Sequence, residues 1–185
     1  MTRTPAEKEA KLRLFYRRQI EDLHRRGTLF AWHLFLDAVK VFPRSGVGLV
    51  PKLGAPAPYT ESESEIRALA ELGATAIDEC RKSTPSVVFE LGILYLVSRD
   101  VAMAASQLAL GRFTFSRFAP FEYRHVAYPL TRAEYQYAMG CRRCSTRGGS
   151  LSRDSLAERA LLGKAADLLQ WWGAILSEVR ACTAS

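Results

Sequence analysis

The sequence predicts an all-α protein made of stacked antiparallel helical hairpins, with irregular loops between some of them. A chain of 185 residues is long enough for one folded domain, and 48% hydrophobic with 24% charged residues is ordinary for a globular protein. Apolar side chains recur at spacings of three and four residues, which is the period of a helix with one buried face. We therefore expect a single helical domain over residues 1–185.

Five helix starts are marked by residues that cap a first turn. In a capping box, a Ser or Thr hydroxyl accepts from the backbone N–H three residues later, and a Glu at that later position accepts from the N–H of the cap. Proline at the first helical position also marks a start, because that position needs no N–H partner. The five starts are Thr4–Glu7, Thr60–Glu63, Thr84–Pro85, Thr131–Glu134 and Ser155–Glu158.

Apolar runs follow these starts, and glycine or proline ends the first two of them. The expected helices are 8–26, 29–42, 61–82, 85–97, 100–112, 132–142 and 154–181. Small residues such as Gly73 and Ala76 form a narrow stripe on the third helix, which lets a neighbouring helix approach closely. The helices at 85–97 and 100–112 are expected to form a tight pair.

Three segments do not fit a helical pattern. The segment 43–60 is rich in proline and glycine, and it is either an arm that binds a partner or a loop tethered to the surface. The segment 113–130 is aromatic and basic, and Pro120 and Pro129 favour an extended backbone. The segment 141–153 is expected to be a basic loop.

Part of the chain resembles the tetratricopeptide and pentatricopeptide families of helical repeats. The first resemblance rests on Leu91, Gly92, Tyr95, Asp100, Ala104, Leu108 and Gly111, at the spacing of a tetratricopeptide pair. The second rests on Tyr16, Ile20, Leu23, Gly27, Leu29, Ala31, Leu34 and Phe35. The first match lacks the closing proline of the repeat, and the second half of the other is out of register by one residue.

These resemblances imply an adaptor that binds other protein subunits of a large, mitochondrial assembly. Length and organisation are similar to the pentatricopeptide-like accessory subunit on the F1 sector of some protist mitochondrial ATP synthases. Helical-repeat subunits of mitochondrial ribosomes or respiratory complexes are equally compatible with this organisation. A cytoplasmic location is the alternative.

A formal net charge of +7 indicates an anionic partner surface, and the basic residues are unevenly spread. The candidate partner-binding residues are Arg13, Arg17, Arg18, Arg25, Arg26, Arg117, Arg124 and Trp171. Trp171 is included because adjacent helical positions lie about 100° apart, so that Trp171 and Trp172 cannot face one core stripe equally. The other interpretation is that both tryptophans are buried, with one of them in a second internal layer. RNA bound by the arginines is the competing function.

Few patterns in the sequence suggest chemistry. Cys141 and Cys144 have the spacing of a zinc-binding pair, but a structural zinc site needs two further ligands; a disulfide, or two ordinary thiols beside arginines that lower a thiol pKa, are the alternatives. Phosphate-binding loops, zinc-protease motifs and nucleophile elbows do not occur. Charges at Glu90 and Arg99–Asp100 interrupt the most apolar stretch, so we expect no membrane span. The predicted function is a non-catalytic adaptor without cofactor or small-molecule substrate.

Overall fold

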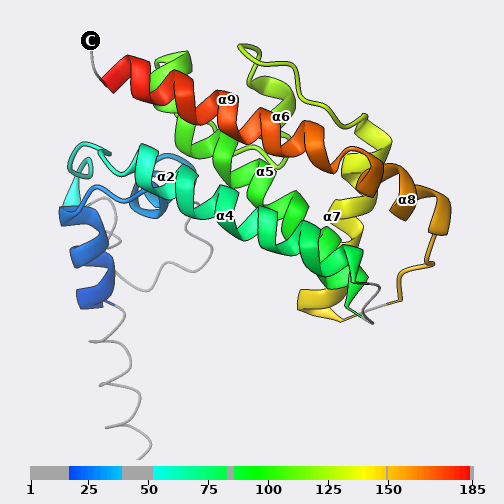
Figure 1. Cartoon of the computed structure of the whole chain (residues 1–185). Helices are drawn as coiled ribbons and strands as arrows, with labels where there is room; N and C mark the ends of the chain where they lie inside the picture. The colour runs from blue at the N-terminus through cyan, green and yellow to red at the C-terminus, as the bar shows by residue number, and fades with distance from the viewer. Residues whose placement is uncertain (1–16, 39–51, 83–85, 149, 184–185) are drawn as a thin grey trace, which may run out of the picture. The chain divides into compact units, whose positions relative to one another are not determined.

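The computed structural model describes residues 17–38, 52–82, 86–148 and 150–183 (Figure 1). Every regular element within these ranges is a helix, which confirms the all-α prediction. The chain divides into two compact units, residues 1–61 and 62–185, where we expected one helical domain. Each unit is described by itself.

The first unit contains a helix over residues 17–25 and α2, Leu29–Asp37. Thr28 is the N-cap of α2, and its side-chain oxygen accepts from the N–H of Ala31 at 3.3 Å. Such a bond satisfies one of the amide groups that a first helical turn leaves without a partner. The break expected between the first two helices is therefore present. The second helix ends at Asp37, before the expected residue 42, because the C-cap Ala38 has an extended backbone. The beginning of the first expected helix lies outside the described residues.

Gly27 makes the turn between these helices with φ of 65°, and a Cβ there would overlap the carbonyl oxygen of Ala57. The end of the Pro/Gly-rich segment, which belongs to the same unit, therefore packs closely against this turn. The N–H of Ala57 donates to the carbonyl oxygen of His24 at 3.1 Å, and the indole N–H of Trp32 donates to that of Ala57 at 3.0 Å. His24 Nε2 also lies 2.9 Å from the carbonyl oxygen of Gly54. This part of the segment is a tethered loop, and residues 39–51 lie outside the described ranges.

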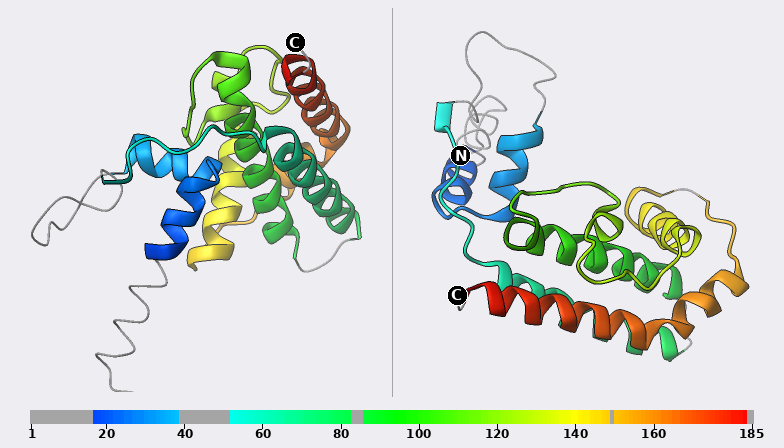
Figure 2. Two further views of the ribbon diagram at one scale, coloured as in Figure 1. Left: turned by 90° about the vertical axis from the view of Figure 1, so that its left-hand side faces the viewer. Right: turned by 90° about the horizontal axis from the view of Figure 1, so that it is seen from above.

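The second unit is a helical bundle with α5 at its centre (Figures 1 and 2). Its helices are α4 (Ser62–Arg81), α5 (Val87–Leu110), α6 (Ala119–Glu122), α7 (Arg132–Arg147), α8 (Ser155–Gly163) and α9 (Ala165–Thr183). Helices α4 and α9 run antiparallel side by side, and α5 lies between this pair and α7. The nitrogen Nε of Arg180 ties the end of α9 to Glu63 Oε1 at the start of α4, at 3.0 Å.

Glycines let the helices of the second unit approach closely. A Cβ on Gly73 would lie 2.5 Å from the ring of Trp172, which is fully buried. A Cβ on Gly92 would lie 2.8 Å from the Cα of Arg142, so α5 and α7 meet backbone against backbone there. The small-residue stripe predicted in α4 is buried, with Ala76 only 2% exposed. Close packing of this kind is what stabilises a helical core.

The expected pair at 85–97 and 100–112 is wrong, because α5 is one continuous helix. No glycine or proline interrupts it between Val97 and Asp100, and Arg99 Nε pairs with Asp100 Oδ1 at 2.7 Å along the helix. Ser98 is fully buried in the same turn. The residues that carry the tetratricopeptide resemblance therefore lie on one helix and its C-cap, Gly111, and do not form a hairpin.

The third irregular segment is also shorter than expected, because α7 continues to Arg147. The hydroxyls of Ser145 and Thr146 donate to the carbonyl oxygens of Cys141 and Arg142, at 2.6 and 2.7 Å, within these last turns. The expected last helix is two helices, α8 and α9, with Lys164 at the junction. Its ammonium group donates to the carbonyl oxygen of Pro129 at 2.7 Å.

The capping predictions have mixed outcomes. The box formed by Thr131 and Glu134 is confirmed at the start of α7. At α8 the cap is Asp154, one residue before the expected Ser155, and it accepts from two backbone N–H groups. At α4 the helix begins at Ser62, and the starts at Thr4 and Thr84 lie outside the described residues. None of the described helices combines the length and apolar character that crossing a bilayer requires.

Candidate functional site

The arginines near the N-terminus are largely paired with acidic residues of their own unit. Arg13 lies outside the described residues. Ion pairs join Arg17 to Glu21 at 2.8 Å, Arg25 to Asp22 at 2.9 Å and Arg26 to Glu61 at 3.6 Å. Arg18 is exposed on the same helix. These surface pairs are screened by solvent and reduce the positive potential that a polyanion would meet.

Helix α2 is the most unusual surface of the first unit. Seven of its nine residues are apolar, yet Ala31 is the only one of the nine that is buried. Phe30 is 52% exposed, Phe35 38% and Leu36 50%. Because these three positions point in different directions around the helix axis, the apolar surface of α2 is wider than a single stripe. It leaves a polar side formed by His33 and Asp37, whose side chains lie 3.6 Å apart. A helix that is apolar over most of its circumference is normally buried in a core or an interface.

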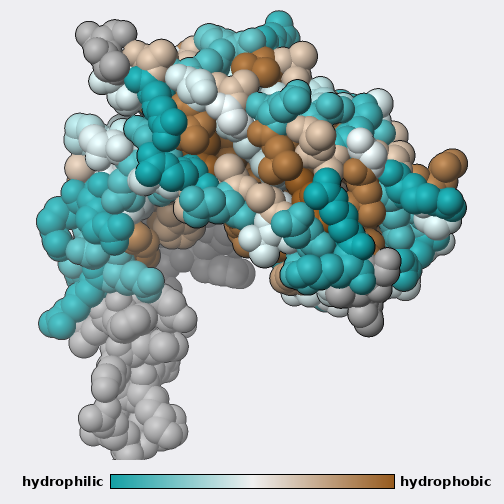
Figure 3. Space-filling view, viewed as in Figure 1, coloured by the Kyte–Doolittle hydropathy of each residue, from teal (hydrophilic) through white to brown (hydrophobic). Residues whose placement is uncertain are grey.

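The second unit exposes smaller apolar areas. Hydrophobic side chains reach the surface between hydrophilic ones over α4 and α9 (Figure 3). Leu72 on α4 is 43% exposed and Leu169 on α9 is 38% exposed. Scattered apolar residues of this kind are common on protein surfaces and do not by themselves indicate a binding site.

The aromatic and basic segment 113–130 turns most of its rings inward. Tyr135 of α7 is fully buried, and its ring is surrounded by those of Phe118, Phe121 and Tyr128, at centroid distances of 6.0, 5.2 and 5.6 Å. The hydroxyl of Tyr135 donates to the carbonyl oxygen of Arg117 at 2.8 Å. The rings thus serve as a second layer of core, which leaves Arg117 and Arg124 exposed outside it.

Trp171 is not the exposed anchor that the sequence suggested. It is 3% exposed, and its indole N–H donates to the carbonyl oxygen of Val126 at 3.1 Å. Its ring packs against Tyr128 with a centroid distance of 4.8 Å. Trp172 is also fully buried. Trp171 is a core residue because the segment 113–130 covers it, and Trp172 is one because its ring packs at Gly73 of α4. This arrangement is the second internal layer that the sequence left open.

Cys141 and Cys144 lie on α7, one helical turn apart. Cys141 is buried, and burial raises the pKa of its thiol to about 11, contrary to the expectation that neighbouring arginines lower it. Burial likewise raises the pKa of Cys80 to about 12. Among the described residues, no three His, Cys, Asp or Glu side chains gather in the way that a metal ion requires. The four cysteines are thiols and form no disulfide.

A surface cavity of about 290 Å³ lies at the C-terminal end of α7, and we call it the α7 cavity. Its lining residues are Gly140, Arg143, Cys144, Arg147, Gly148, Ser150 and Leu151. The two arginines are exposed and four residues apart, so that they share one face of the helix. The lining contains no acidic residue. Sequence reasoning missed this cavity, although the spacing of the arginines was visible.

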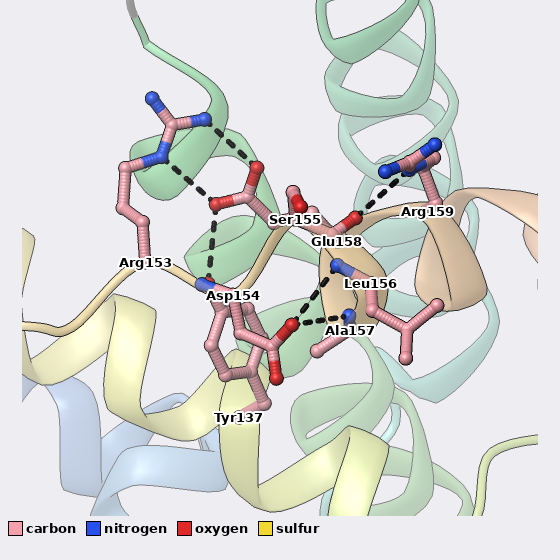
Figure 4. Close-up of polar contacts among 8 residues, drawn as sticks. All are labelled: Tyr137, Arg153, Asp154, Ser155, Leu156, Ala157, Glu158 and Arg159. Carbon is pink, nitrogen blue, oxygen red and sulfur yellow. Dashed lines mark hydrogen bonds and ion pairs between the residues drawn. The ribbon is translucent and has the colours of Figure 1, made fainter.

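A cluster of polar side chains holds the start of α8 to α7, close in sequence to the lining of the α7 cavity (Figure 4). The guanidinium of Arg153 donates twice to the carboxylate of Glu158, at 2.9 and 2.8 Å, and the hydroxyl of Tyr137 donates to it at 3.1 Å. The N–H of Asp154 donates to that hydroxyl at 3.1 Å. Hydrogen bonding from Arg153 lowers the pKa of Glu158, which is 8% exposed. These bonds join the start of α8 to α7.

A second cavity, of about 250 Å³, lies between the end of α5 and the end of α9. Its lining is mostly apolar, with His125, Glu178 and Cys182 among the lining residues. The carboxylate of Glu178 accepts a hydrogen bond from the buried hydroxyl of Tyr123 at 2.5 Å. The polar group best placed to bind a ligand there is therefore already engaged within the protein.

Comparison with protein-family models, with curated proteins and with solved structures finds no matching family, relative or structure.

Proposed function

We propose that this chain is a non-catalytic adaptor, an accessory subunit that joins a larger protein assembly through α2. The observation that carries the proposal is the difference between composition and burial in that helix, with seven apolar residues of nine and one buried residue. Burying a Phe or Leu side chain contributes about 1.5–3 kcal/mol. The exposed Phe30, Phe35 and Leu36 together therefore hold enough apolar surface to anchor a complex.

The partner that fits α2 is a protein with an apolar groove and an acidic rim. Helices commonly bind other proteins by placing apolar anchors in such a groove. Residues 1–61 contain eleven Lys or Arg and six Asp or Glu, which gives this unit a formal charge of +5. Charges of opposite sign around the groove would accelerate association and make it sensitive to salt. The sequence resemblance suggests a mitochondrial assembly, with the F1 part of ATP synthase as one candidate.

The test of the adaptor function replaces exposed apolar residues by charged ones. We expect Phe30→Asp combined with Leu36→Asp to remove the chain from its complex, as measured by co-purification from mitochondria and by size-exclusion chromatography. Leu156→Asp is the matched control, since Leu156 is 74% exposed on α8 of the other unit. Circular dichroism should be unchanged in both variants, because all three side chains are exposed.

A photo-activated cross-linker at position 30 identifies what covers α2. A cross-link to an acidic groove of another protein supports the adaptor. Cross-links to a second copy, or to residues 62–185 of the same chain, would overturn it, because α2 would then stabilise an oligomer or the monomer itself. If nuclease treatment releases the chain from its complex, RNA binding is the better function. RNA binding has less support than the adaptor function, because Arg17, Arg25 and Arg26 are already paired with acidic residues.

A further inference from the structure

Arg143 and Arg147 line the α7 cavity together, and neither has an acidic partner among the described residues. Eight others, in both units, form ion pairs with Asp or Glu: Arg17, Arg25, Arg26, Arg67, Arg81, Arg99, Arg153 and Arg180. Two positive charges one turn apart repel each other and destabilise a helix slightly. An anion bound between them would relieve that repulsion.

The end of α7 does not use these arginines as caps. The last carbonyl oxygens of a helix attract basic side chains, which is a common structural role for arginine. Here the carbonyl oxygen of Cys144 accepts from the N–H of Gly148 at 3.1 Å, and neither Arg143 nor Arg147 donates to a carbonyl oxygen of the described residues. The guanidinium groups of the arginine pair are therefore available to a ligand.

The neighbouring arginine gives a contrast within the same loop. Arg153, two residues beyond Leu151 of the cavity lining, is bound at two points by Glu158 and is therefore not available to a ligand. Leu151 supplies an apolar surface, since its Cδ1 lies 3.3 Å from the position of a Cβ on Gly140. The α7 cavity therefore combines an apolar side, the hydroxyl of Ser150 and two guanidinium groups.

We infer that the α7 cavity binds a phosphate monoester, with Arg143 and Arg147 as the residues that hold its phosphate group. A phosphate monoester carries about −1.5 to −2 charges at pH 7, which balances two arginines, whereas a carboxylate carries one. The planar guanidinium groups each offer paired donors that match phosphate oxygens. The volume of about 290 Å³ is at the small end of ligand pockets and suits a compact ester or one phosphorylated side chain.

This inference does not depend on the adaptor function, because α2 belongs to the other unit. The test is isothermal titration of the full chain in low-salt chloride buffer. The probes are inorganic phosphate, glycerol 3-phosphate, a phosphoserine peptide with its unphosphorylated form, and acetate. We expect Arg143→Gln combined with Arg147→Gln to weaken binding of the phosphate probes at least tenfold. Arg117→Gln combined with Arg124→Gln removes the same charge elsewhere in the unit and should change affinity less than twofold.

The outcomes distinguish a phosphorylated protein from a free phosphate ester, and both from a non-specific attraction of anions to positive charge. A phosphoserine peptide that binds at least tenfold more tightly than glycerol 3-phosphate points to a phosphorylated protein, and the reverse order points to a free ester. Both results support the cavity. The inference is wrong if no phosphate probe binds at millimolar concentration, if acetate competes equally, or if both arginine pairs matter equally. It is also wrong if RNA without a terminal phosphate binds more tightly than every ester. Circular dichroism confirms that each variant is folded.

Discussion

Helices α2 and α5 are both rich in apolar residues, but they are buried to very different degrees. Thirteen of the 24 residues of α5 are buried, and its partners α4, α6, α7 and α9 lie around it. One of the nine residues of α2 is buried. The comparison shows that apolar composition predicts that a helix is buried, but does not say which part of which molecule buries it. For α5 it is the same unit, and for α2 we propose that it is a partner.

The largest expected effect tests this difference by shortening one leucine in each helix. Leu94 of α5 is 1% exposed, so Leu94→Ala should lower the free energy of unfolding by about 2–5 kcal/mol through lost contacts and a new cavity. Leu36 of α2 is 50% exposed, and Leu36→Ala should change the same quantity by less than about 0.5 kcal/mol. Urea unfolding followed by circular dichroism measures both.

A large loss of stability in Leu36→Ala would contradict the comparison. It would mean that α2 contributes to a folded core of the isolated chain, and the adaptor function would lose its main support. A small loss in Leu94→Ala would mean instead that α5 can be repacked around the missing atoms.

Much of the fold could be predicted from local sequence signals. The capping box at Thr131 and the small-residue stripe of α4 both depend on residues close together in sequence, and both are present. The continuity of α5 could not be predicted from the repeat pattern, because burial by four other helices makes almost every side of it apolar. The extension of α7 could not be predicted because Ser145 and Thr146 are poor helix formers, and in the structure their hydroxyls donate back to carbonyl oxygens within the helix.

The candidate sites were harder to predict because they depend on contacts between distant segments. Trp171 became a core residue through Val126, which lies 45 positions earlier in the chain. Arg17 is a weaker candidate for binding an anion because it pairs with Glu21 on the same helix. That pairing was visible in the sequence, since the two residues are four positions apart. The α7 cavity requires the loop before α8 to fold back onto α7, and the hydrogen bonds that fix it involve Arg153 and Glu158.

A second experiment compares two glycines of the second unit. A methyl group on Gly92 would meet the backbone of α7, so Gly92→Ala should lower the free energy of unfolding by about 1–3 kcal/mol. Nothing lies within 4 Å of the corresponding position on Gly173 in α9. Because alanine favours helix over glycine, Gly173→Ala should raise stability by up to about 1 kcal/mol. Equal effects of the two changes in urea unfolding would argue against close contact between α5 and α7.

The smallest expected effect is a pH-dependent change in stability, which distinguishes a buried carboxylate from an exposed one. Hydrogen bonding from Arg153 lowers the pKa of Glu158 below its ordinary value of 4.5, so the folded state favours the ionised carboxylate. The resulting stability is complete above pH 4.5 and is lost as the pH falls through the lowered pKa. Glu158→Gln should therefore cost about 1–2 kcal/mol near pH 7, and the difference from the natural chain should shrink at lower pH.

Glu71→Gln is the matched control for this experiment, because Glu71 is exposed on α4. It should change stability by less than about 0.5 kcal/mol at any pH. Urea unfolding of the three proteins between pH 3 and pH 7 measures the differences. The difference in free energy of unfolding between Glu158→Gln and the natural chain could stay constant over this range. That result would show that the amide destabilises the protein through its shape and not through the lost charge. The charge pair with Arg153 would then not be what holds the start of α8 to α7.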